Sequence, residues 1–132
     1  MKYNELTLRY FESAPGAGVL SGADAFHGAA GSRGRGTWVR FDLQVNSGTI
    51  QAARFQAFGC PHTIAVAAWV VEQAIGRGVR TALPETVEDL SKRFAVPVEK
   101  RGRLLIIEDA WEAAAAAAAA GPAGGEPLPA GT

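Results

Sequence analysis

The only cysteine of the chain, Cys60, lies where a strand-like run gives way to a long apolar helix. Pro61, which follows it, favours the first position of a helix because its φ is already helical and its missing N–H would have no partner there. A thiol at a helix N-terminus faces unpaired backbone N–H groups and the positive end of the helix dipole, which stabilise the thiolate. Such a thiolate could bind metal, carry sulfur or act as a nucleophile. The alternative is a buried, unreactive cysteine.

Length and composition predict one globular domain. The chain has 132 residues, of which 48% are hydrophobic and 20% charged, a balance that suits an ordinary core. Its 13 basic and 13 acidic residues leave no net charge, so we expect no nucleic-acid and no membrane partner. No apolar run approaches the ~20 residues that span a bilayer, and no signal peptide is visible. Because one cysteine cannot form an internal disulfide, we expect a cytoplasmic protein.

The hydrophobic pattern predicts an antiparallel hairpin in the first half of the chain. Apolar and polar side chains alternate over residues 37–45, which is typical of a strand with one buried face. Residues 46–48, Asn-Ser-Gly, have turn chemistry, and a second strand should return over residues 49–58. Ile50 is out of phase with that strand, which predicts a bulge near the turn. The Gly- and Ala-rich residues 21–36 are compatible with a short edge strand plus a loop.

Helices are expected on both sides of this hairpin. They are predicted over residues 3–13, from about 60 to 75, over 86–95, and from about Arg103 into eight consecutive alanines whose far end should fray. In the second of these, Ile64, Ala68, Val71 and Ile75 form an apolar stripe. The predicted fold is therefore α+β, a small antiparallel sheet of two or three strands packed on helices. It should occupy residues 1–120, followed by a disordered Gly-, Pro- and Ala-rich tail at 121–132.

Several segments, in order along the chain, resemble one known family. Residues 50–65 read Ile-Gln-Ala-Ala-Arg-Phe-Gln-Ala-Phe-Gly-Cys-Pro-His-Thr-Ile-Ala, and are similar to the I-x-x-A-R-F-x-x-x-G-C-x-x-x-I-A signature of the U-type iron–sulfur cluster scaffolds, which include IscU and the N-terminal domain of NifU. The start at 10–15 resembles the tyrosine- and proline-containing first helix and loop of these proteins. Residues 108–110, Glu-Asp-Ala, resemble part of their closing helix. A segment similar to their L-P-P-V-K sequence consists of Val96, Pro97, Val98, Glu99 and Lys100.

This resemblance implies a function without catalysis. Proteins of the family assemble a [2Fe–2S] cluster, with sulfur from a cysteine desulfurase, and pass the cluster to apo-proteins. The resemblance therefore implies a cysteine desulfurase as partner, with a chaperone or apo-protein acceptors as further partners. It also implies that residues 96–100 form a partner-binding segment.

The family's cluster ligands, three cysteines and an aspartate, can be carried over position by position. Cys60 matches the middle cysteine. The first cysteine falls on Arg35 and the aspartate two positions later falls on Thr37. The third cysteine falls on Arg103, and the histidine that precedes it falls on Gly102. Four of the five site positions therefore lack the chemistry that the resemblance would imply.

These substitutions change what the site could bind. Iron–sulfur clusters are usually held by four thiolates, and this chain offers one. Exchanging two thiolates for two guanidinium groups raises the local formal charge by roughly four units. If Arg35 and Arg103 face Cys60, they should repel iron, lower the pKa of the thiol and attract anions. A [2Fe–2S] cluster or iron in one protomer is therefore disfavoured.

Several alternatives for the site stay open at this point, one of which is a small anionic ligand held by the two arginines. A homodimer could bridge a metal with Cys60 and His62 from each protomer. Cys60 could instead receive sulfur as a persulfide and pass it on without holding iron. The protein could also be a paralogue that binds or regulates the desulfurase without binding a cluster. Finally, a mononuclear zinc site could form from Cys60, His62, His27 and Asp24.

Overall fold

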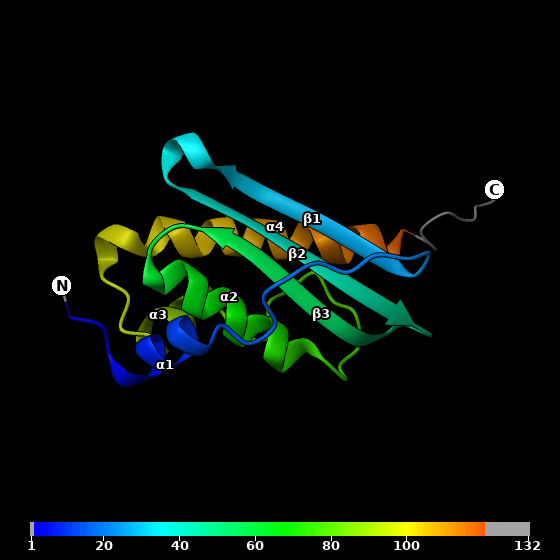
Figure 1. The fold of residues 1–132 in the computed structure, drawn as a ribbon, viewed down its shortest axis with the longest axis horizontal. Coiled ribbons are helices and arrows are strands. Elements are labelled where there is room, and N and C mark those ends of the chain that lie inside the picture. Colours follow the sequence, from blue (N-terminus) through cyan, green and yellow to red (C-terminus); the bar gives the residue numbers. More distant parts are fainter. Residues whose placement is uncertain (1, 121–132) are drawn as a thin grey trace.

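The computed structural model describes residues 2–120, so the tail predicted at 121–132 lies outside the described residues. Within that range the chain forms a three-stranded sheet and four α-helices, which confirms the predicted α+β class (Figure 1). The elements are, in order, α1 (Glu5–Ser13), β1 (Ala25–Ser32), the 3₁₀ turn η1 (Arg33–Arg35), β2 (Thr37–Asn46), β3 (Thr49–Phe58), α2 (Pro61–Ala74), α3 (Val87–Arg93), the 3₁₀ turn η2 (Val98–Lys100) and α4 (Arg101–Ala119).

The sheet is antiparallel throughout, with strand order β1-β2-β3. The predicted hairpin is formed by β2 and β3, and Ser47 and Gly48 in its turn both have positive φ, at 53° and 76°. The expected bulge is present, because the register shifts between Gln44 and Val45 and leaves Val45 paired with Ile50. The bulge brings Ile50, which is out of phase in the sequence, onto the buried side of the sheet, where it is 1% exposed.

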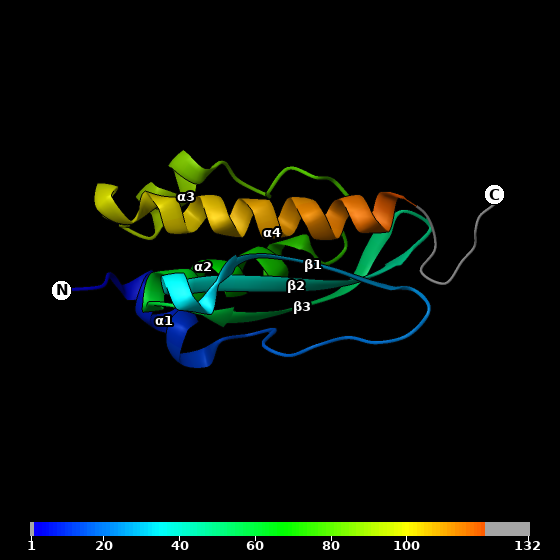
Figure 2. The same ribbon diagram turned by 90° about the horizontal axis from the view of Figure 1, so that it is seen from above.

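Helices α2 and α4 pack against the sheet and α1 packs against α2. Figure 2 shows α4 running along the sheet as a separate layer. Apolar side chains of β2, α2 and α4 form the core between these elements, and its fully buried members include Val39, Phe41, Leu43, Val66, Val70, Leu104 and Ile107. None of the helices within residues 2–120 is long and apolar enough to cross a bilayer.

Helix α2 is buried on most of its surface, which the predicted single apolar stripe did not anticipate. Its contacts with α1, β3 and α4 enclose it, so Val66 and Trp69 are buried together with Ala68 and Val71. The stripe was wrong at its last position. Ile75 is 46% exposed because α2 ends at Ala74 and Ile75 adopts an extended conformation.

The alanine-rich half of α4 packs on β1 and is helical to Ala119. Gly28 of β1 explains the close packing, since a Cβ built there would lie 2.2 Å from the backbone nitrogen of Ala114. Small residues on both elements let the helix and strand approach closely, and Ala114 and Ala115 are fully buried as a result. The Gly- and Ala-rich segment thus forms edge strand β1, followed by η1.

Candidate functional site

Cys60 is the residue before the first turn of α2, at the junction with β3. It has extended backbone angles and Pro61 occupies the first helical position, as expected from the sequence. Helix α4 begins at the same end of the molecule (Figure 1). The site is therefore built where two helix N-termini meet the end of a strand.

Two side chains contact the sulfur of Cys60. Arg103, in the first turn of α4, donates a hydrogen bond from Nη1 to Sγ across 3.3 Å. Thr63 Oγ1 lies 3.7 Å from the same sulfur. The thiol itself is half-buried, so the sulfur is neither sealed in the core nor fully in solvent. Of the two arginines that the sequence resemblance predicted at cysteine positions, Arg103 therefore faces the thiol.

Several groups act together on the pKa of Cys60. Partial burial raises the pKa of the thiol, but the backbone N–H and hydroxyl of Thr63, the backbone N–H of His62 and the charge of Arg103 outweigh burial. The net result is a pKa below the ordinary value. The sulfur is therefore poised to carry negative charge, which makes it a better nucleophile near neutral pH.

His62 points into the protein rather than toward solvent. Its side chain is 1% exposed, and its ring packs edge-on against Tyr3 with centroids 4.7 Å apart. Neither ring nitrogen has a hydrogen-bond partner among the described residues. Burial lowers the pKa of His62, and the positive charges of Lys100 and Arg103 lower it further. The folded environment therefore favours the neutral imidazole.

The other substituted positions lie near the thiol end but do not contact the sulfur. Arg35, in η1, is exposed, and no hydrogen bond or ion pair joins it to Cys60 in residues 2–120. Its side chain lines a shallow hollow together with the buried Thr37 and with Ile106. Gly102 is exposed in the first turn of α4. Arg103 alone among the four substituted positions touches the thiol in the described chain.

The predicted partner-binding segment is a surface turn anchored in the core. Val96 is buried, whereas Val98 is 75% exposed at the start of η2. Pro97 and Lys100 are half-buried, and Glu99 is exposed. Lys100 Nζ lies 5.7 Å from the ring of Tyr3, so this turn covers the ring that packs on His62.

The residues present do not fit a metal or a [2Fe–2S] cluster. Among residues 2–120, no three His, Cys, Asp or Glu side chains are grouped so that they could hold a metal ion. The zinc site considered from the sequence does not form, because Asp24 instead accepts hydrogen bonds from Gln44 and Asn46. His27 is exposed on β1.

Sequence reasoning missed Thr63 and Tyr3 as neighbours of the site. Thr63 could have been found from its spacing, because the third helical residue faces the side chain of the residue that caps a helix. No local signal marks the packing of Tyr3 on His62, since the two residues meet only through the tertiary fold.

Comparison with known proteins identifies the family of the chain. Residues 2–121 match the sequence profile of the NifU-like N terminal domain. The chain belongs to this family. IscU of Aquifex aeolicus, an iron–sulfur cluster assembly scaffold protein, is 33% identical over 102 residues, which cover 75% of this chain and 64% of that protein. IscU of Escherichia coli K12 is 28% identical over 119 residues, covering 88% of this chain and 93% of the relative.

The same fold is seen in a solved relative. The N-terminal NifU-like protein of Brucella abortus superposes with a TM-score of 0.69 at 17% identity, and the match covers 89% of this chain and 94% of that one. Proteins of the NifU-like N-terminal family related to IscU are iron–sulfur assembly scaffolds, not enzymes. The full sequence of this member contains a single cysteine.

Proposed function

We propose that this protein handles sulfur in iron–sulfur cluster assembly, with Cys60 as the sulfur acceptor. The observation that carries the proposal is the 3.3 Å contact between Arg103 Nη1 and Cys60 Sγ, made at a half-buried thiol. A guanidinium group at this position stabilises a sulfur anion and opposes the binding of Fe²⁺ beside it. The site therefore suits an anionic sulfur cargo better than a metal.

The proposed step is a persulfide transfer. The Cys60 thiolate attacks the outer sulfur of a persulfide carried by a cysteine desulfurase. A bond forms between Cys60 Sγ and that sulfur, while the sulfur–sulfur bond of the donor breaks and its electron pair leaves with the donor cysteine as a thiolate. The persulfide on Cys60 remains anionic beside Arg103, and no outside oxidant or reductant is required.

Thr63, in the first turn of α2, supports the same step. Its hydroxyl and the backbone N–H groups of the first turn of α2 surround the sulfur on the helix side, while Arg103 approaches from α4. Hydrogen bonds to charged groups are stronger than those between neutral groups, so this arrangement favours the anion over the neutral thiol. An apo-protein or another scaffold would take the sulfur next, in the cytoplasm.

A cysteine desulfurase is the partner we propose for this site. Val98 is the most exposed large apolar residue of the described chain and belongs to a turn whose neighbour, Val96, is fixed in the core. Phe58, two residues before Cys60, is also 47% exposed. Exposed apolar side chains at the end of the molecule that carries the thiol suit a protein partner that covers the thiol while sulfur is passed.

Incubation with a cysteine desulfurase and L-cysteine tests the proposal. Mass spectrometry should find one added sulfur atom on wild-type protein and none on Cys60→Ser. Arg103→Gln should accept sulfur more slowly, whereas Arg101→Gln, which removes an exposed arginine from the same helix turn, should match wild type. Absence of a persulfide on Cys60 under conditions where an IscU control is labelled would refute the assignment.

A second candidate is a regulator that docks on the desulfurase without accepting sulfur. The exposure of Val98 favours docking whatever the chemistry of Cys60. In this case the protein would bind the desulfurase and change its turnover, and Cys60→Ser would do so equally well.

The homodimer in which Cys60 and His62 of two protomers bridge a metal is tested by iron and sulfide analysis after anaerobic reconstitution. Such a site requires that the wild type binds iron and that Cys60→Ser does not.

A further inference from the structure

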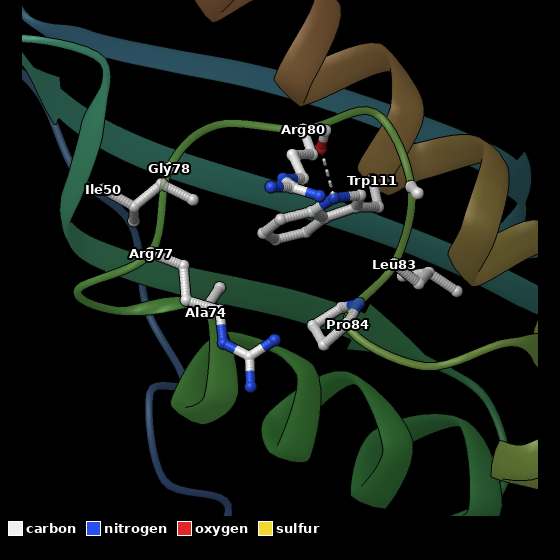
Figure 3. A pocket seen from close by; sticks show the side chains of 9 residues that line it. Ile50, Ala74, Arg77, Gly78, Arg80, Leu83, Pro84 and Trp111 are labelled. Carbon is white, nitrogen blue, oxygen red and sulfur yellow. Dashed lines mark hydrogen bonds between the residues drawn. The ribbon is translucent and has the colours of Figure 1, made fainter.

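A pocket at the opposite end of α2 from Cys60 is the second feature of the molecule that could bind a ligand. It has a volume of about 460 Å³ and lies between the end of α2, the loop that follows it and α4 (Figure 3). Helix α2 has 14 residues, so the pocket is about 20 Å from the thiol along the helix. It is therefore separate from the sulfur site. Its volume is within the usual range for small-molecule sites.

The walls of this pocket are held in place by hydrogen bonds. Trp111 Nε1 donates to the backbone carbonyl of Arg80 across 3.0 Å, which ties the loop to α4. Ile50 N donates to the carbonyl of Arg77 and Val79 N to that of Gly48, which tie the same loop to the β2–β3 turn. The loop has no helix or strand of its own, yet it is fixed on both sides. A ligand would meet a pre-formed site with little ordering cost.

The lining combines an apolar interior with two cationic side chains. Leu83 and Pro84 are half-buried and supply the accessible apolar surface, while Ile50, Ala74 and Trp111, at most 2% exposed, line the pocket from the core. Arg77 and Arg80 are exposed at the rim. Figure 3 shows the Arg80 side chain passing beside the Trp111 indole, while Arg77 extends on the other side, by the end of α2.

Neither rim arginine is neutralised within the part of the chain that the structure describes. No ion pair involves Arg77 or Arg80 there, and no acidic side chain lines the pocket. The nearest acidic residues in sequence are engaged elsewhere: Glu72 accepts from the hydroxyl of Tyr10, and Glu85 pairs with Arg93. The pocket thus carries positive charge over an apolar interior, although the whole chain has no net charge.

We propose that this pocket binds a small organic acid, with the acid's apolar or aromatic body against Leu83 and Pro84, next to Trp111, and its carboxylate at the rim that carries Arg77 and Arg80. Guanidinium groups match planar carboxylates in shape and charge. A simple inorganic anion has no apolar part that could contact the apolar walls of the pocket. The predicted ligand class is therefore an amphipathic carboxylate rather than a free anion or a neutral aromatic compound.

Naphthaleneacetate and its amide provide a matched pair of probes, since they share the same body and differ in charge. The indole N–H signals of the three tryptophans can be followed by NMR during titration, with the Trp111 signal assigned from Trp111→Phe. Naphthaleneacetate should shift the Trp111 signal saturably and bind about tenfold more tightly than naphthaleneacetamide. Acetate alone should not reach saturation over the same range.

Variants of the two arginines locate the charge. Arg77→Gln and Arg80→Gln should each weaken the acid several-fold, and the double variant should bind acid and amide equally. Both side chains are exposed and the bond to Trp111 uses the backbone of Arg80, so folding should be unaffected. Arg101→Gln, ten residues before Trp111 on α4, is the charge-matched control. Equal binding of acid and amide by wild type, or undiminished acid binding by the double variant, would overturn the proposal.

The sulfur function and this pocket can fail separately. Cys60→Ser should bind naphthaleneacetate with an unchanged dissociation constant. Conversely, the double arginine variant should still accept sulfur on Cys60.

Discussion

Arg103 Nη1 lies 3.3 Å from Cys60 Sγ and joins the first turn of α4 to the start of α2, although the two residues are 43 positions apart in the chain. The protein therefore places a cation in direct contact with its single thiol. This contact, together with the backbone N–H groups in the first turn of α2, lowers the pKa of the thiol and so favours its anionic form.

Removing the charge of Arg103 should raise the pKa of Cys60. Arg103→Gln takes away the guanidinium that stabilises the thiolate, so alkylation by iodoacetamide at pH 7 should slow and its pH profile should move upward. Arg103→Lys, which keeps the charge, should restore much of the rate. The control is Arg101→Gln. An unchanged pH profile for Arg103→Gln would show that the contact does not act on the thiol in solution.

Thr63 should also be needed for the low pKa of the thiol. Thr63→Val keeps the shape of a fully buried side chain but removes the hydroxyl that lies 3.7 Å from Sγ. The pKa of Cys60 should rise, while the free energy of unfolding changes by about 1 kcal/mol or less. Thr63→Ser retains the hydroxyl and should behave like wild type in the same alkylation assay. Matching pH profiles for the Thr63→Val and Thr63→Ser variants would contradict this role.

Stability should fall in mild acid because of His62. Its pKa is lowered in the folded protein by burial and by Lys100 and Arg103, so the unfolded state binds the proton more readily. Above the ordinary histidine pKa of about 6.5, His62 therefore does not change the free energy of unfolding. As the pH falls below that value, the free energy of unfolding decreases. Urea unfolding at pH 7.5 and pH 5.5, chosen as roughly one unit either side of that pKa, should show the loss.

Two variants assign this pH dependence to one residue. His62→Phe keeps a ring against Tyr3 without an ionisable group and should flatten the decline. His27→Gln, which replaces the exposed histidine of β1, should leave the decline as in wild type. An equal decline in His62→Phe and wild type would assign it to other groups.

The close packing of β1 on α4 should make Gly28 intolerant of a side chain. The added methyl group of Gly28→Ala would lie 2.2 Å from Ala114 N, so either the strand or the helix must move. We expect a loss of about 3 kcal/mol in the free energy of unfolding. Gly34→Ala is the matched control, because a Cβ there meets nothing within 4 Å. Denaturant titration should give a change of about 0.5 kcal/mol or less for that control.

The exposed turn at η2 should contribute to binding of a cysteine desulfurase. Val98→Asp places a charge on the most exposed apolar residue of the turn and should weaken the complex about tenfold without affecting the fold. Calorimetric titration with the desulfurase measures this effect. Ile75→Asp introduces the same charge at the far end of α2, where Ile75 is 46% exposed, and should bind normally. Equal affinities of the two variants for the desulfurase would show that the turn is not part of the interface.

Several parts of the fold could be read from the sequence because the determining interactions are local. Alternation of polar and apolar residues predicted β2 and β3, and the phase change at Ile50 predicted the bulge that the register shows. Pro61 and the following apolar run located the start of α2 next to Cys60. The order of motifs around Cys60 also indicated the family, which the match over residues 2–121 confirms.

Other features depended on which elements pack together, and no local pattern carries that information. Strand β1 has only a weak signal in the sequence because Gly28 and its small neighbours have little strand preference, whereas their size is what lets α4 approach. The sequence placed Arg35 and Arg103 at family cysteine positions, but only the meeting of α2 and α4 decided that Arg103 reaches the sulfur. The pocket rimmed by Arg77 and Arg80 likewise depends on tertiary contacts, because the loop after α2 is hydrogen-bonded to Trp111 and to the β2–β3 turn. The sequence by itself determined the elements and the chemistry available, while the tertiary structure decided which charges meet.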